Sequence, residues 1–258
     1  MAQPQYVAAV LGSTGATGAA LLSALADSPR FSKVVAIARS EGATSATSSK
    51  ITGTKLDLDL LAEAAAAAAS PSPSTSSPPN PLEGADVVFV ALGTTRAAAG
   101  SAEAFWKVDV GGVESAAALS SAARVPLFSL VSASGASRNG WRPTLSCLHP
   151  LYYAAAKGAA EEAALKSSSA KSTLVYRPGL LDRGAGKQRG GERLAIGLIG
   201  LPSLKVEDLA AVMVSDAVAE LDKIKNGNAA AASGEVVKGD GEIKRDAAAL
   251  ASSAAAGC

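Results

Sequence analysis

The 258-residue chain has few of the residues that build metal centres or disulfide frameworks. It has one histidine, His149, and two widely separated cysteines, Cys147 and Cys258. We therefore expect neither a metal-ligand cluster nor a set of disulfides, and a reducing compartment is the default. No apolar run approaches the roughly 20 residues that a transmembrane helix needs, so no membrane-spanning segment is expected.

An excess of charge of one sign is also lacking, with 24 basic and 23 acidic residues. Aromatic residues make up 4% of the chain and are not interleaved with a basic stripe, which argues against nucleic acid as a partner. The N-terminal stretch MAQPQYVAAVLG has neither the basic region of a signal peptide nor the arginine-rich character of a transit peptide. These absences predict a cytoplasmic protein.

Strand and helix patterns alternate along most of the chain. Apolar runs typical of buried parallel strands occupy residues 6–12, 33–39, 85–93, 126–134 and 172–181, with a weaker candidate at 55–60. Helical patterns occupy residues 19–29, 103–123, 150–167 and 206–221. This alternation predicts a single α/β domain: a Rossmann-like, doubly wound parallel sheet with helices on both faces.

We assign this domain to residues 1–224. Within it, residues 64–81 read AAAAAASPSPSTSSPPNP, a low-complexity stretch that we interpret as a flexible surface insertion. Residues 225–258 form a C-terminal extension that is rich in glycine and alanine, with a short strand pattern at EVV. Its last part is either a helix docked on the same domain or a frayed tail, and the sequence leaves both open.

A glycine-rich turn stands directly between the first strand and the first helix. Gly12, Gly15 and Gly18 are three positions apart in the stretch GSTGATG. Glycines allow a sharp turn and a close approach to a pyrophosphate, and a helix N-terminus supplies unpaired N–H groups and positive potential. Thr14 and Thr17 add hydroxyl donors. This context predicts dinucleotide binding.

The end of the second strand indicates which dinucleotide binds. NAD sites place an Asp or Glu there for the ribose 2′-hydroxyl, whereas an arginine suits a 2′-phosphate. Here the strand ends in Arg39 and Ser40, and the first acid, Glu41, comes late. The sequence therefore favours NADP(H).

Tyr153 and Lys157 are one helical turn apart on the same face of a predicted helix. A free phenol has a pKa of about 10, and a neighbouring ammonium lowers it. Tyr153 could then give a proton to a carbonyl oxygen while a nicotinamide gives hydride. Ser132, which directly follows the apolar run of the segment at 126–134, is the predicted hydroxyl partner for that oxygen, with Ser134 as the alternative.

Together these features resemble the short-chain dehydrogenase/reductase superfamily. Four stretches resemble its atypical branch, which contains the Tat-interacting protein oxidoreductases and fungal mitochondrial outer-membrane relatives: LGTTRAAAGSAEAFWKVD, LVSASGAS, YYAAAKGAAEEA and VYRPGLLDR. The resemblance covers most of residues 6–222, but not the 64–81 insertion or the chain beyond about residue 225.

The resemblance implies a set of cofactor-binding residues. These are Thr14, Gly15, Ala16 and Thr17 at the pyrophosphate; Arg39 and Ser40 at the adenosine phosphate; Leu92 and Gly93 at the adenine ribose; and Tyr153, Lys157, Leu181 and Arg189 toward the nicotinamide. The alignment at Arg189 needs a one-residue gap.

We therefore expect an NADPH-dependent oxidoreductase of the carbonyl reductase type, acting on a small carbonyl compound. The alternative is a catalytically weak NADPH-binding sensor or regulatory protein. The resemblance also leaves open a peripheral position on the mitochondrial outer membrane, and protein partners.

Overall fold

The computed structural model describes residues 5–39, 48–69, 79–138, 149–184, 202–227 and 234–256. Two of the predicted cofactor-binding residues, Ser40 and Arg189, lie outside these ranges. So do residues 70–78 of the predicted insertion.

Seven strands form the main sheet, in the order β3-β2-β1-β4-β5-β6-β9, and every pairing is parallel. The strands are β1 (Tyr6–Leu11), β2 (Phe31–Ala38), β3 (Ile51–Lys55), β4 (Val87–Val90), β5 (Leu127–Val131), β6 (Ser172–Arg177) and β9 (Gly234–Gly239). The first six follow the strand order of doubly wound sheets, in which the order reverses between β1 and β4. The predicted Rossmann-like fold is confirmed.

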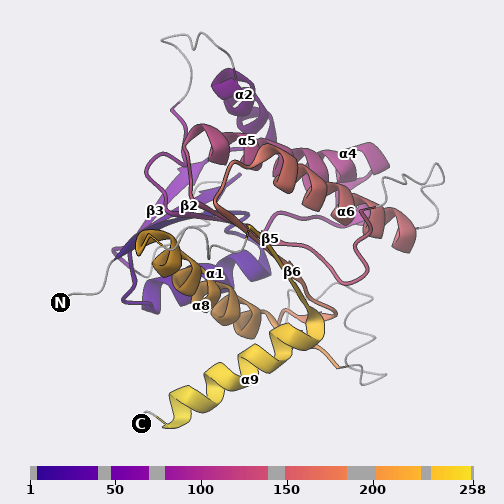
Figure 1. The fold of residues 1–258 in the computed structure, drawn as a ribbon. Helices are drawn as coiled ribbons and strands as arrows, with labels where there is room; N and C mark the ends of the chain where they lie inside the picture. The colour runs from indigo at the N-terminus through magenta and orange to yellow at the C-terminus, as the bar shows by residue number, and fades with distance from the viewer. Residues whose placement is uncertain are drawn as a thin grey trace.

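Helices cover both faces of the sheet (Figure 1). One face carries α1 (Ala16–Asp27), α8 (Val206–Lys225) and α9 (Asp240–Ala256). The other carries α2 (Leu58–Ala69), α5 (Gly112–Ala122) and α6 (His149–Ser167), with the short helices α3 (Arg96–Ala99) and α4 (Ala102–Trp106) beside them. A π-helical turn, Lys107–Gly111, joins α4 to α5.

The core consists of two apolar layers, one on each side of the sheet. Leu21 and Leu25 of α1 pack against one face, and Val113 and Ala117 of α5 pack against the other. Every residue of β4 is fully buried, because a central parallel strand is covered by helices from both sides. The continuous apolar runs of the sequence reflect this double burial.

The third predicted strand is wrong, because residues 58–60 begin helix α2 and β3 ends at Lys55. The alternation LDLDL resembles a strand, but Leu58 and Leu61 also fit a helical stripe. Asp57 decides for the helix, since its Oδ1 accepts the N–H groups of Asp59 and Leu60 at 3.0 and 2.9 Å.

The predicted surface insertion also needs correction. Ala64–Ala69 belong to α2, where Ala64 and Ala65 are buried against the same layer as α5. Alanine is the strongest helix former and leaves room for close packing, so this stretch can join the core despite its low complexity.

The predicted strand 172–181 is two strands. β6 ends at Arg177, and β7 (Leu181–Asp182) pairs with β8 (Leu204–Lys205) in a separate sheet. Pro178 separates them, since proline cannot donate to the ladder.

The C-terminal residues from 234 onward belong to the same sheet and core. β9 pairs with β6, and Ile243 of α9 is fully buried. Lys238 of β9 bridges Asp216 of α8 and Asp246 of α9 at 2.7 Å each. α9 is thus a helix docked through its first half, while residues 251–255 are exposed.

Candidate dinucleotide and catalytic site

Two cavities lie at the carboxyl edge of the sheet and share a wall. The first has a volume of about 310 Å³ and the second about 490 Å³. Gly15, Ala91, Leu92 and Gly93 line both of them, so the cavities meet where β1 and β4 end. Open α/β sheets bind ligands at this reversal point, and the combined volume is within the range of ligand sites.

Two glycines of the turn fit against their surroundings with no space for a side chain. Gly12 has φ +80°, and a Cβ there would lie 2.7 Å from the carbonyl oxygen of Ala91. A Cβ on Gly18 would lie 2.1 Å from the carbonyl oxygen of Gly12. The same oxygen accepts the N–H of Gly15 at 3.0 Å, which closes the turn. Gly12 and Gly18 therefore shape the turn, whereas Gly15 lines both cavities.

The N-terminus of α1 faces the junction of the cavities. The helix begins at Ala16 after an extended Gly15, no side chain caps it, and its first turn holds no acid. The first N–H groups of such a helix have no intrahelical partner and carry partial positive charge. Thr14 lines the first cavity, and Ala16 and Thr17 line the second. These residues fit a pyrophosphate that crosses from one cavity to the other.

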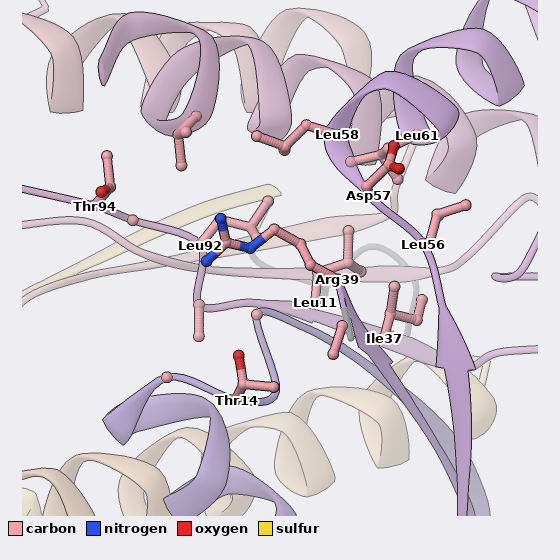
Figure 2. A pocket seen from close by; sticks show the side chains of 16 residues that line it. Leu11, Thr14, Ile37, Arg39, Leu56, Asp57, Leu58, Leu61, Leu92 and Thr94 are labelled. Atoms are coloured by element: carbon pink, nitrogen blue, oxygen red, sulfur yellow. The ribbon is translucent and has the colours of Figure 1, made fainter. Parts of the chain in front are cut away.

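The first cavity has apolar walls and two charged side chains (Figure 2). Apolar side chains come from β1, β2, the α2 region and the end of β4, and include Leu11, Ile37, Leu56, Leu58, Leu61 and Leu92. Arg39, at the end of β2, extends into the middle of the lining residues (Figure 2). Within the described part of the chain, Arg39 forms no ion pair, so its guanidinium can meet an anion.

Asp57 is the second charged residue of this cavity and was not among the predicted site residues. Its carboxylate caps α2, so one residue both starts the helix and lines the cavity. The available signal was an Asp placed before a helical stripe of Leu58, Leu61 and Ala65. The prediction divided this stripe between a strand at 55–60 and an insertion at 64–81.

The second cavity brings together the predicted catalytic side chains. Tyr153 and Lys157 come from α6, and Ser132 and Ser134 follow the end of β5. Lys157 Nζ lies 5.9 Å from the centre of the Tyr153 ring. Leu181, predicted near the nicotinamide, lines the same cavity.

The neighbouring Tyr152 has a different environment. It is buried, and its hydroxyl donates to the carbonyl oxygen of Ala102 at 3.1 Å. Its ring also packs edge-on against Trp106, with ring centres 5.8 Å apart. Tyr152 therefore belongs to an aromatic cluster rather than to the cavity.

Lys157 is buried and paired with an acid. Its Nζ lies 2.7 Å from Oδ1 of Asp109, which is itself fully buried on the π-helical turn. The other carboxylate oxygen of Asp109 accepts the N–H of Thr94 at 2.9 Å. The lysine is thus held by a buried carboxylate on another element while it lines the second cavity.

The Ser132 hydroxyl is also engaged by an acid. It donates to Glu161 Oε1 at 2.5 Å, and Glu161 further accepts hydrogen bonds from Arg138 and Arg177. Burial opposes ionisation of Glu161, but the hydrogen bonds from Arg177, Ser132 and Arg138 prevail and lower its pKa. The proton of Ser132 thus points to Glu161, whereas Ser134 is exposed at the cavity.

Most predicted site residues lie in these two cavities. The first is lined by Gly12, Thr14, Gly15, Arg39, Leu92 and Gly93. The second is lined by Gly15, Ala16, Thr17, Leu92, Gly93, Ser132, Tyr153, Lys157 and Leu181. Gly18 lines neither and acts through its packing on Gly12. Arg183, which lines the second cavity, was not predicted.

Comparison with known proteins supports a nucleotide-binding fold. A family model described as NAD(P)H-binding matches residues 12–218. Protein FMP52-1 of Scheffersomyces stipitis, a mitochondrial protein by name, is 34% identical over 172 residues, which are 67% of this chain and 66% of that protein. The mitochondrial protein fmp52-1 of Aspergillus terreus is 32% identical over 175 residues, with the same coverage. The match thus spans just under two thirds of each relative's length.

Solved structures of similar fold are more distant in sequence. The oxidoreductase ylbE from Lactococcus lactis has a TM-score of 0.59 and 18% identity, covering 95% of this chain and 97% of its own. A short chain dehydrogenase from Burkholderia cenocepacia, solved with NADP, has a TM-score of 0.58 and 19% identity, covering 99% and 97%. At this identity the likeness shows the fold.

The predicted cytoplasmic location is wrong as the main expectation, because both curated relatives are named as mitochondrial proteins. Across the described residues, no helix is both long and apolar enough to cross a membrane. The resemblance to the fungal mitochondrial proteins is confirmed, whereas the resemblance to the Tat-interacting protein oxidoreductases stays a prediction. The family model covers most of the chain and the sheet is Rossmann-like, so the chain belongs to the NAD(P)H-binding family.

Proposed function

We propose that the protein is an NADP(H)-dependent oxidoreductase that reduces the carbonyl group of a small molecule. One observation carries the proposal: Tyr153 and Lys157, one turn apart on α6, line the cavity that opens onto the glycine turn. A phenol beside an ammonium, next to a dinucleotide site, can supply the proton for carbonyl reduction and stabilise the phenolate that remains.

The two cavities suit the two halves of a dinucleotide. The pyrophosphate would lie at Gly15 and the N-terminus of α1, the adenosine half in the first cavity and the nicotinamide half in the second. Arg39 would meet a ribose 2′-phosphate, which supports NADP(H) over NAD(H). Gly93 and Leu92 would lie between the halves, since they line both cavities.

When bound, the nicotinamide supplies the hydride, which goes to the carbonyl carbon. Tyr153 gives the proton to the carbonyl oxygen, so the product is an alcohol and the phenol is left as a phenolate. The ammonium of Lys157, 5.9 Å from the ring centre, stabilises that negative charge until solvent returns the proton. Ser134 can donate to the same oxygen directly, whereas Ser132 must first leave Glu161.

A test compares Tyr153→Phe with Tyr152→Phe as the matched control. NADPH binding is measured by its fluorescence, and NADPH oxidation is measured with a panel of aldehydes and ketones. We expect Tyr153→Phe to bind NADPH within about threefold of wild type and to lose about 10²-fold or more in kcat, the range of general acid catalysis. Tyr152→Phe loses the hydrogen bond to Ala102 and should keep its turnover. Equal turnover in both variants would refute Tyr153 as the proton donor.

A second function, an NADPH sensor with little catalysis, is favoured by the engaged state of Ser132, whose hydroxyl donates to Glu161 instead of to a substrate oxygen. If wild type binds NADPH tightly and oxidises it with no member of the carbonyl panel, the sensor is preferred.

We also propose a mitochondrial location, which the names of both fungal relatives support. Cell fractionation with carbonate extraction tests it and separates a peripheral membrane protein from a free one. Recovery in the cytosolic fraction alone would refute the proposal.

A further inference from the structure

Asp109 is a fully buried carboxylate that connects the two cavities. Its Oδ1 lies 2.7 Å from Lys157 Nζ, and its Oδ2 accepts the N–H of Thr94, which lines the first cavity. A Cβ on Gly93 would lie 3.5 Å from both Asp109 Oδ1 and Lys157 Nζ. The ion pair therefore lies directly against Gly93, at the wall that both cavities share.

The backbone that carries Asp109 is unusual. Residues Lys107–Gly111 form a π-helical turn between two α-helices. Such turns are rare and occur frequently at functional sites, because the extra residue in the turn redirects the side chains. Here the turn carries an acid whose exposure is 0%, a burial that carboxylates show only when they are paired. An isolated surface pair would need neither feature.

The charge of Asp109 is needed because it is the carboxylate that the structure pairs with Lys157. The titratable or charged residues that line the second cavity are Tyr153, Lys157 and Arg183. Two carboxylates behind its wall are engaged elsewhere, since Glu161 accepts from Ser132 and Asp240 accepts from the N–H of Gly179. Lys157 is 5% exposed, and burial without a counter-ion favours the neutral amine. A neutral amine could not stabilise a phenolate at Tyr153.

We propose that Asp109 is a positioning residue of the proposed reaction, keeping Lys157 charged and fixed beside Tyr153 while anchoring the Thr94 loop. This inference rests on the proposed function for its kinetic consequence only. The ion pair itself can be tested without turnover, so that the two proposals can fail separately.

The test compares Asp109→Asn with Asp86→Asn. The asparagine at 109 keeps the volume and the acceptor for Thr94 but removes the charge. Asp86 is the matched control, since its carboxylate accepts the N–H of Val7 at 2.8 Å just before β4, at the opposite edge of the sheet. Removing the carboxylate charge at 109 should lower the pKa of the Lys157 ammonium, 2.7 Å away, by about one unit or more. We expect the alkaline limb of the kcat profile to move about one unit or more to lower pH in Asp109→Asn, with NADPH affinity within about threefold.

The measurement without turnover is acylation of Lys157, quantified by mass spectrometry at neutral pH. Because a lower pKa leaves more neutral amine, the rate should rise about tenfold in Asp109→Asn and remain at the wild-type value in Asp86→Asn. Asp109→Glu, which restores the charge, should return both readouts toward wild type. Should Asp109→Asn not fold, Asp109→Glu decides: a kcat profile and acylation rate near wild type support the proposal, and a shifted profile overturns it.

The outcomes separate the two proposals. A wild type that binds NADPH without turnover, combined with faster acylation in Asp109→Asn, refutes the reductase and leaves the ion pair standing. Turnover in wild type, with the pH profile and acylation rate of Asp109→Asn equal to those of Asp86→Asn, overturns the role of Asp109.

Discussion

Replacing Gly18 by alanine should destabilise the protein and abolish dinucleotide binding, although helix propensity alone predicts the opposite. Gly18 is in the first turn of α1, where Gly→Ala would gain up to about 1 kcal/mol. A Cβ there, however, would lie 2.1 Å from the carbonyl oxygen of Gly12, and contacts under 3.0 Å essentially never occur. That oxygen must therefore retreat by about 0.9 Å, the difference between these two distances.

Movement of the Gly12 carbonyl oxygen would weaken the hydrogen bond that closes the turn. The Gly12 oxygen accepts the N–H of Gly15 at 3.0 Å, and Gly12 cannot move back freely, because it already lies against Ala91. Overpacking of this kind costs about 1–3 kcal/mol, and a backbone partner places it at the upper end. Once the gain in helix propensity is subtracted, we expect the free energy of unfolding to fall by about 1–2 kcal/mol, which lowers Tm by roughly 2–8 °C for a chain of this size.

Thermal unfolding with and without NADPH measures both effects. NADPH at 100 times its Kd should stabilise wild type by about 2.7 kcal/mol, and this gain should vanish in Gly18→Ala. Gly241→Ala is the matched control, since Gly241 is in the first turn of α9 and its Cβ would meet nothing within 4 Å. It should be neutral or stabilising by up to about 1 kcal/mol and keep the NADPH response. A Gly18→Ala protein that is as stable as Gly241→Ala and still responds to NADPH would refute the reasoning.

Three further predictions concern the charged and hydroxyl groups of the site. Arg39→Ala should weaken NADPH binding by about 10–100-fold, the value of a charge-assisted hydrogen bond, and leave NADH affinity within about threefold of wild type. Lys33→Ala, on β2, is the control. Equal losses of affinity for both coenzymes would contradict the assignment of Arg39 to the 2′-phosphate. Ser134→Ala should lower kcat by about tenfold or more. Ser132→Ala should chiefly lower stability, by about 1 kcal/mol, because the Ser132 hydrogen bond goes to Glu161. A larger loss of kcat in Ser132→Ala than in Ser134→Ala would make Ser132 the donor. Glu161→Gln should destabilise by about 2–4 kcal/mol, since it leaves two partly exposed arginines without their carboxylate. The pKa of Glu161 in the folded protein lies below its ordinary value of 4.5. Its contribution to the free energy of unfolding is therefore fully present above pH 4.5 and is lost as the pH falls through the folded pKa. Denaturant titrations from about pH 7 downward should accordingly show less acid sensitivity in Glu161→Gln than in wild type.

The glycine turn shows how much the sequence can predict about this site. The pattern GSTGATG between an apolar run and a helix located the turn, because few residues other than glycine tolerate the φ of +80° at Gly12. The pattern did not distinguish the three glycines. The three-dimensional arrangement assigns Gly18 to packing on Gly12 and Gly15 to the cavity walls.

The choice between Ser132 and Ser134 as the hydroxyl donor could not be predicted from the sequence, for a different reason. Ser132 and Ser134 are two residues apart on the same segment, so periodicity treats them alike. Glu161, twenty-nine residues beyond Ser132 on another element, takes the Ser132 proton. A local pattern cannot predict where a hydroxyl proton points when its acceptor comes from a distant helix.

By itself, the sequence determined the alternation of strands and helices, the glycine turn and the spacing of Tyr153 and Lys157, because each depends on neighbours within one or two turns of the chain. The tertiary structure decided which acids lie inside. Asp109 and Glu161 look like ordinary surface acids in the sequence, and each is held at the site by partners from segments distant from its own. Burial of a charge depends on what the rest of the chain places around it, so only the folded protein reveals these partners.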